Sequence, residues 1–185
     1  NANAYYTDWT DQQVTVPGPS GTFFDARTEN AGKSDLWGTE VETVYLPQAN
    51  TEIYLTISYA KTRFRDYIGR DFNGQPVDLS GNEFPQAPRW TGAVGMLHRW
   101  ANGFDFDLRG SYTGTSFFTP LNLESQKSDA FFIVDARIGY VAQRWSIHAY
   151  ARNLFDQQYL TRVRLDGFST AGEAQVIGLT VSGNI

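Results

Sequence analysis

Apolar and polar residues alternate along most of this chain of 185 residues. From Phe104 to Thr113, every second residue is aromatic, aliphatic or glycine, and the residues between are charged or carry a hydroxyl group. A period of two is that of a β-strand whose two faces meet different surroundings. Comparable patterns, some weaker, predict about eight strands, at residues Ala2–Val16, Leu36–Leu46, Glu52–Tyr59, Arg89–Arg99, Phe104–Thr113, Phe132–Tyr140, Trp145–Arg152 and Ile177–Ile185.

The connections between the predicted strands alternate in length without a break. The short ones are Pro47–Asn50, Ala101–Gly103 and Val141–Arg144, and the long ones are Pro17–Asn30, Tyr67–Pro88, Thr119–Asp129 and Leu160–Gly172. A meander with its short turns at one end and its long loops at the other is typical of an antiparallel up-and-down transmembrane β-barrel. No stretch has convincing helical spacing of apolar residues, so the chain is predicted to be all-β.

Aromatic residues recur at even spacings along several predicted strands, which places both members of a pair on one strand face. Eight to ten steps of roughly 3.3 Å, tilted by about 40°, span roughly 20–25 Å, close to the apolar band between the aromatic girdles of such barrels. The pairs are Trp37 and Tyr45, Phe104 and Tyr112, Phe132 and Tyr140, and Trp145 and Phe155.

Hydropathy alone would indicate a soluble protein, because its mean is −0.40. That mean does not exclude a barrel, since outward apolar and inward polar residues average to neutral. No run of 18 apolar residues is present, which excludes a membrane-spanning helix. A soluble β-sandwich also alternates, but it explains neither the loop lengths nor the aromatic spacing, and its strands usually have only about five or six residues.

The candidate chemistry is sparse. A net charge of −5 argues against broad nucleic-acid binding, and the absence of cysteine excludes disulfides and thiolate metal sites. His98 and His148 lie on different predicted strands without metal-ligand spacing, so we interpret each as a polar lumen or interface residue. No catalytic serine context or phosphate-binding glycine loop is present, so neither an enzyme nor a cofactor is predicted.

Several segments, taken in order, resemble the C-terminal barrel portion of TonB-dependent outer-membrane receptors. The most specific is Ala151–Tyr159, which contains Asn-Leu-Phe-Asp and resembles the penultimate-strand signature of that family. Weaker similarities are found at Tyr6–Val14, Asn30–Glu42, Pro85–Trp90 and Gly178–Ser182. The chain departs from the family at its end, where Gly183 and Ile185 occupy positions that are usually aromatic.

The resemblance implies a plugged barrel of about 22 strands, of which residues 1–185 would supply about the last eight. We therefore expect a fragment without plug domain or TonB box, located in the bacterial outer membrane. The implied function is TonB-energised uptake of a small metal chelate, a ferric siderophore being favoured, with TonB engaged by the missing N-terminal part. The alternatives are a small eight-stranded structural barrel, or a receptor of the same family for cobalamin, haem or a carbohydrate.

Charged residues alternate with the apolar ones, on the face expected to line the lumen. We interpret them as a cross-strand ion-pair ladder that contacts the plug in a whole receptor, although a ligand path could also use them. They are Glu40, Glu42, Glu52, Asp105, Asp107, Arg109, Asp135, Arg137 and Arg152.

Arginine and aromatic residues gather on the long-loop side of the predicted sheet. Guanidinium groups and aromatic rings suit flat, anionic ligands. The predicted ligand-binding residues are Arg63, Arg65, Tyr67, Arg162, Arg164 and Phe168. Further candidates of the same kinds are Arg27, Arg70, Phe72, Phe117, Phe118 and Tyr159. The competing interpretation is a solvated surface or contacts with lipopolysaccharide phosphates. Arg162 and Arg164 would point inward if their strand continued unbroken, whereas a bulge near Asn153 would reverse them.

Overall fold

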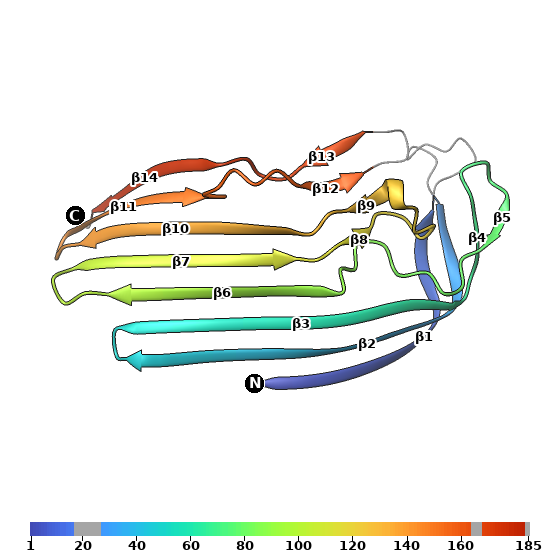
Figure 1. Cartoon of the computed structure of the whole chain (residues 1–185), viewed down its shortest axis with the longest axis horizontal. Helices are drawn as coiled ribbons and strands as arrows, with labels where there is room; N and C mark the ends of the chain where they lie inside the picture. Colours follow the sequence, from blue (N-terminus) through green and yellow to red (C-terminus); the bar gives the residue numbers. More distant parts are fainter. Residues whose placement is uncertain (17–26, 164–167, 184–185) are drawn as a thin grey trace.

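A computed structural model describes residues 1–16, 27–163 and 168–183, and it contains one eight-stranded antiparallel sheet (Figure 1). The strand order is β1-β2-β3-β6-β7-β10-β11-β14, so each main strand pairs with its neighbour along the chain. The eight strands are β1 (Ala2–Val16), β2 (Arg27–Gln48), β3 (Thr51–Asp66), β6 (Trp90–Arg99), β7 (Phe104–Thr113), β10 (Phe131–Val141), β11 (Trp145–Arg152) and β14 (Val176–Gly183). All eight predicted strands are confirmed, although Ile185, the predicted end of the last one, lies outside the described residues.

Two strands extend well beyond their predicted bounds. β2 begins at Arg27 rather than Leu36, and β3 continues to Asp66 rather than ending at Tyr59. Both extensions lie at the long-loop end, where neither strand keeps a regular row of apolar residues. Apolar alternation therefore marks only part of each strand, and hydrogen-bonded pairing continues past it.

The described parts of the long connections lie at the opposite end of the sheet from the short ones, as predicted, whereas residues 17–26 of the first long connection lie outside the described residues (Figure 1). The long ones contain small hairpins, formed by β4 (Ile68–Arg70) with β5 (Pro76–Asp78), β8 (Ser116–Phe117) with β9 (Lys127–Ser128), and β12 (Leu160–Val163) with β13 (Ser169–Ala171). The 3₁₀ turn η2 (Glu124–Gln126) precedes β9. Within the described ranges, no helix is both long enough and apolar enough to cross a membrane.

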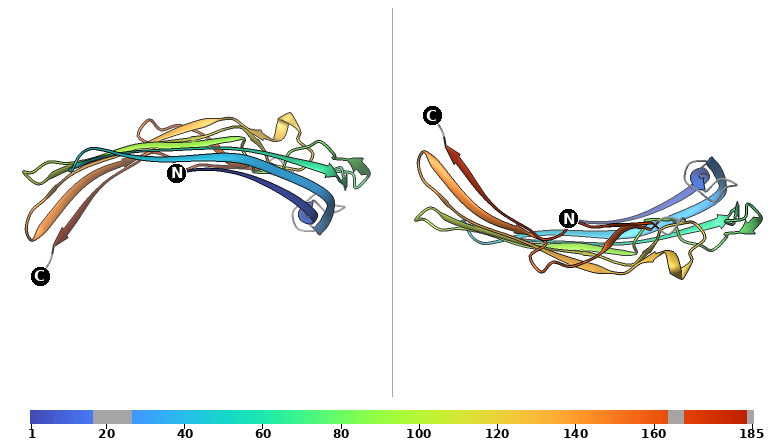
Figure 2. Two further views of the ribbon diagram at one scale, coloured as in Figure 1. Left: turned by 90° about the horizontal axis from the view of Figure 1, so that it is seen from below. Right: turned by 90° about the horizontal axis from the view of Figure 1, so that it is seen from above.

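The main sheet is a single curved layer that does not close on itself (Figure 2). Figure 2 shows that β14 at one edge and the long-loop end of β1 and β2 at the other bend toward the same side. A sandwich would need a second packed sheet, whereas the smaller sheets here are two-stranded hairpins in the long connections. The open sheet has the form of part of a barrel wall and does not have the closed ring of a small eight-stranded barrel.

The pairing register gives the sheet one apolar face, hereafter the outer face. Phe106 of β7 pairs with Ile138 of β10, which pairs with Ala149 of β11 and, through it, Leu179 of β14. Ile138 and Leu179 are 52% and 63% exposed. Exposed apolar side chains across four strands indicate that this face lies against lipid or another apolar surface, because large contiguous apolar patches are uncommon on soluble monomers.

Aromatic side chains form two rows across the outer face. Toward the long-loop end, the ring of Tyr59 lies 5.2 Å from Trp37 and 4.7 Å from Trp90. Toward the short turns, Tyr140 lies 5.0 Å from Phe104 and 5.6 Å from Trp145. The rows match the two expected girdles. One predicted pair is wrong: Phe155 lies beyond the end of β11 at Arg152, so it does not share a strand with Trp145.

The opposite, inner face is polar and contains side chains that lie across glycines of the neighbouring strand. His148 pairs with Gly139, where an added Cβ would lie 2.1 Å from the imidazole ring. The bare glycine lets His148 Nε2 reach Asp105, 3.0 Å away on the strand beyond. Arg137 lies 3.7 Å from the same carboxylate and 3.9 Å from Asp107. These contacts confirm cross-strand ion pairing among several of the predicted inner charges.

The two faces should respond differently to charge in the complete membrane protein. Ala149→Arg places a cation among the outer-face apolar residues, and we expect it to destabilise the protein by about 2–4 kcal/mol near the bilayer midplane. Arg152→Ala removes an exposed inner-face ion pair with Glu173, at 3.1 Å, and should cost at most about 1 kcal/mol. Urea unfolding in lipid vesicles measures both, and equal losses would show that the faces are assigned wrongly.

Candidate functional site

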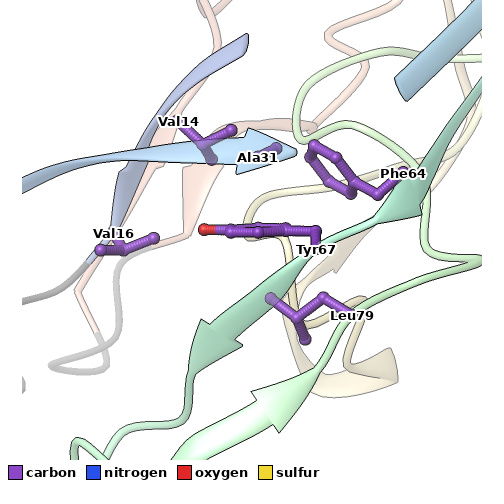
Figure 3. Packing of buried hydrophobic residues seen from close by; sticks show 6 residues of the cluster. All are labelled: Val14, Val16, Ala31, Phe64, Tyr67 and Leu79. Carbon is purple, nitrogen blue, oxygen red and sulfur yellow. The ribbon is translucent and has the colours of Figure 1, made fainter. Parts of the chain in front are cut away.

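The buried apolar side chains of the described residues cluster at the long-loop end of the sheet. Phe64 of β3 is fully buried, and its ring centroid lies 5.0 Å from that of Tyr67 (Figure 3). β1, β2, β3, the link between β3 and β4, and the loop after β5 supply the cluster, so it joins the long connections to the wall. Its members are Val14, Val16, Ala31, Phe64, Tyr67 and Leu79, with Val77, Phe84 and Leu121 packed against them.

A backbone corner in β1 brings that strand over the inner face. Asp11 has a positive φ of 55°, and beyond it the side chain of Gln12 accepts a hydrogen bond from Ser34 at 2.6 Å. Ser34 pairs in register with Phe64, whose side chain lies in the buried cluster. Even-numbered residues of β1 therefore turn inward after Asp11, which brings Val14 to the same cluster. Figure 2 shows the bend of this hairpin.

A cavity of about 520 Å³ lies beside this cluster. Its wall combines amide, aromatic and guanidinium groups, and its volume lies within the range of small-molecule sites. Residues from β1, β3, the loop before β6, the loop after β8 and β12 all contribute, so five separate parts of the chain meet there. The lining residues are Gln12, Gln13, Val14, Thr15, Val16, Phe64, Phe84, Pro85, Gln86, Ala87, Phe118, Thr119, Pro120, Arg162 and Val163.

A second cavity of about 680 Å³ lies between the loop before β10 and the β12–β13 hairpin. Phe131 and Tyr159 stack in its wall with ring centroids 4.2 Å apart. Asp129, Asp156 and Glu173 make this wall more acidic than that of the first cavity. Among the residues that the structure describes, no group of three His, Cys, Asp or Glu side chains is arranged to hold a metal ion.

Asn153 forms the corner at which the chain leaves β11. Its φ is 48° and its side chain is almost fully buried. The amide donates to the carbonyls of Gln157 and Glu173, each at 2.9 Å, and accepts from the Gln157 N–H at 2.8 Å. Asp156, also at positive φ, accepts from the Gln175 N–H. The Asn-Leu-Phe-Asp segment is thus a structural clasp that ties the end of β11 to the start of β14.

The predicted ligand residues do not gather in one place. Arg162 lines the first cavity, and Tyr67 lies in the buried cluster beside it with 1% of its surface exposed. Phe168 is 69% exposed immediately before β13. Arg164 lies outside the described residues. The inward direction of Arg162 was conditional on a strand that continues unbroken from β11. The strand is interrupted between Asn153 and Tyr159, so the alternation of faces from Ala149 does not tell which way the Arg162 side chain points.

Arg63 and Arg65 lie on the outer face rather than beside the cavity. Arg63 pairs in register with Asp35 and donates to its carboxylate at 2.8 Å. Arg65 is the extra residue of a bulge and forms ion pairs with Asp8 and Asp35. The outer-face alternation of each strand continues past the aromatic residues toward the long-loop end. It leads from Tyr6 to Asp8 in β1, from Trp37 to Asp35 in β2 and from Tyr59 to Arg63 in β3.

Sequence reasoning missed most of the first cavity. The alternation of apolar and polar residues places Gln12 and Gln13 in an ordinary strand and Phe84 in a long loop. A glutamine pair beside Asp11, a residue type that tolerates positive φ, is a weak signal of a corner. Phe118 was a candidate from its residue type alone. No local pattern could have shown that β1 and the loops before β6 and after β8 meet.

A family model for TonB dependent receptor-like β-barrels matches residues 1–154. The chain belongs to this family. Family members reside in the outer membrane of Gram-negative bacteria and are transport receptors rather than enzymes. For a TonB-dependent receptor barrel, the long-loop end is extracellular, the outer face meets lipid and the inner face lines the lumen.

Solved receptors share the fold across nearly the whole chain. The siderophore receptor PiuA from Acinetobacter baumannii superposes with a TM-score of 0.77 at 16% identity, covering 97% of this chain and 25% of PiuA. The ferric yersiniabactin uptake receptor FyuA from Yersinia pestis gives 0.77 at 20% identity, covering 97% and 26%. The copper transporter OprC gives 0.71 at 15% identity, covering 97% and 27%. The chain thus spans about a quarter of each receptor's length.

The Asn153 clasp yields a stability prediction for the complete receptor. Asn153→Gly retains a residue that accepts positive φ but removes three side-chain hydrogen bonds, at an expected cost of about 2–3 kcal/mol. Asn153→Ala also strains the backbone and should cost more. Denaturant unfolding of the folded receptors in detergent compares the two variants. Equal stability of wild type and both variants would contradict the clasp.

Tyr67 yields a pH prediction. Burial, with a smaller contribution from the Glu29 carboxylate, raises the pKa of Tyr67 to about 12 from an ordinary value of 10.0. The pKa of Tyr67 is higher in the folded than in the unfolded protein. The contribution of the neutral Tyr67 phenol to stability is therefore fully present below pH 10 and is lost as the pH rises toward 12. Ultraviolet titration of the receptor and its Tyr67→Phe variant should differ by one phenol ionising near pH 12. A difference near pH 10 would place Tyr67 in solvent.

Proposed function

We propose that this chain forms part of the wall and extracellular mouth of a receptor that imports a small metal chelate, a ferric siderophore being the favoured ligand. The first cavity carries the proposal. It lies at the extracellular end, beside a buried cluster that anchors three strands, and its wall joins amides, aromatic rings and one guanidinium group. Such a wall suits a flat, anionic chelate, because arginine pairs with anionic oxygens and aromatic rings stack on planar groups.

Arg162, Phe84 and Phe118 are the proposed contacts for the chelate. Arg162 would pair with an anionic oxygen, and the two phenylalanines would pack against ring faces. The amides of Gln12, Gln13 and Gln86 could donate to further oxygens. Arg164 and Phe168 remain predicted contacts, whereas the outer-face positions of Arg63 and Arg65 and the burial of Tyr67 favour other roles for them.

We also assign, as part of this proposal, the remaining receptor functions to parts of the protein outside residues 1–185. We propose that residues 1–185 are a partial barrel domain, that preceding segments supply the remaining wall and the plug, and that TonB energises transport through them. The inner-face cluster of Asp105, Arg137 and His148 lies near the short turns, where it would face the plug. Fold similarity to PiuA, FyuA and OprC supports this assignment, and the chemistry of the cavity favours an anionic chelate over cobalamin or a neutral carbohydrate.

The test is ligand binding by the complete receptor and its Arg162→Gln variant. The probes are ferric catecholate, ferric hydroxamate and ferric citrate chelates, with cobalamin and haem as competitors of other classes. We expect at least one ferric chelate to bind, and Arg162→Gln to weaken it about tenfold or more, because a charge-assisted hydrogen bond is worth about 1.5–3 kcal/mol.

Arg144→Gln is the matched control. Arg144 lies in the short turn between β10 and β11, at the opposite end of the sheet, and its substitution removes the same charge. It should leave affinity unchanged, and heat-modifiable gel mobility should show that both variants assemble. Binding of cobalamin or haem but no ferric chelate would refute the ligand class. Unchanged chelate affinity in the Arg162 variant would remove Arg162 from the site.

A further inference from the structure

Three cations alternate with two buried residues along the extracellular end of β3. Lys61, Arg63 and Arg65 are exposed, while Thr62 and Phe64 between them are buried toward the inner side. Lys61 pairs in register with Trp37 and Arg63 with Asp35, so both continue the row of outer-face residues, and Arg65 in the bulge contacts the same Asp35 carboxylate. Lys33 of β2, also exposed, pairs with Asp66 beside them. We refer to Lys33, Lys61, Arg63 and Arg65 as the outer basic patch.

The aromatic row places the outer basic patch at a definite depth. Tyr59 lies between Trp37 and Trp90 in that row, and Arg63 is four residues farther along the same strand. Four steps of about 3.3 Å, on a strand tilted by about 40°, rise roughly 10 Å. Aromatic girdles mark the boundary between hydrocarbon and headgroups, so the patch lies at headgroup depth in the outer leaflet.

The charges on the patch are only partly paired. Asp35 contacts both arginines, and Asp8 contacts Arg65. No carboxylate among the described residues lies within ion-pair distance of Lys33 or Lys61. Half of the Arg63 side chain is exposed, and its only described partner is Asp35. The carboxylates therefore orient the guanidinium groups, while two ammonium groups and part of Arg63 face outward.

We propose that the outer basic patch binds a phosphate of an outer-leaflet lipid headgroup. Lys61 and Arg63 would hold the phosphate oxygens, with Lys33 as a further cation, since exposed guanidinium and ammonium groups are the usual phosphate partners in proteins. The lipid is a phosphorylated one with acyl chains long enough to cover the apolar outer face below the aromatic row. This inference rests on the orientation of the family in the membrane and is independent of the ligand in the cavity.

The test measures lipid binding by the complete receptor after delipidation in detergent. The probes are lipid A with both phosphates, the same lipid with its phosphates removed, and inorganic phosphate as a competitor, with bound lipid counted by native mass spectrometry. The main variant is Lys33→Gln/Lys61→Gln, because it leaves the ion pairs of Arg63 and Arg65 intact. We expect phosphorylated lipid A to bind about tenfold more weakly to this variant, and the dephosphorylated lipid to bind equally weakly to both proteins.

Two controls separate the patch from general charge. Arg99→Gln/Arg109→Gln removes the same charge from the inner face, where Arg99 pairs in register with Asp105 and Arg109 with Asp135, and should bind lipid A as the parent does. Lys33→Arg/Lys61→Arg should restore binding. Equal lipid A binding by the parent and the Lys→Gln variant would overturn the proposal. Displacement of the lipid by millimolar inorganic phosphate would also overturn it, because the patch would then be a site for small anions.

Discussion

The structure depends on strand pairing within a single layer. Each main strand hydrogen-bonds to its neighbours, and only such pairing satisfies the backbone where a sheet lies in lipid. With no second sheet beneath, the register alone decides which side chains share a face. Ile138 then lies beside Phe106 and Ala149, while Asp105 lies opposite Gly139, within reach of His148. The apolar outer face, the ion pairs and the aromatic rows all follow from that register.

The pattern in the sequence predicted the lipid-facing part of the wall because lipid on one side and water on the other impose a period of two. β7, for example, has the bounds predicted from Phe104 to Thr113. The pattern did not predict the first residues of β2 or the last residues of β3. Arg27 to Asp35 lies beyond the aromatic row, where lipid no longer imposes an apolar outer face, so this segment has no apolar rhythm. The corner at Asp11 also escaped prediction, and at Asn153 the sequence indicated only a bulge as an alternative, because positive φ depends on a whole turn.

The candidate site was less predictable than the wall. Arginine content indicated anion binding, but the side of the wall that each arginine occupies depends on where its strand ends. The predicted strand ends at Tyr59, so the alternation was not followed to Arg63, which counting in twos from Ile57 places on the outer face. Arg162 reaches the cavity through a hairpin that follows the Asn153 clasp, and β1 reaches it through a corner. Such long-range meetings leave no local signal in the sequence.

Spin labels along β7 in the complete receptor, reconstituted in lipid bilayers, test the assignment of the two faces most directly. This chain contains no cysteine, so single cysteines at positions 104–109 add no competing thiol within it. Oxygen, which concentrates in the hydrocarbon, should relax labels at 104, 106 and 108 strongly and labels at 105, 107 and 109 weakly. Accessibility without alternation, or with maxima at 105, 107 and 109, would contradict the account of an outer lipid face and an inner polar one.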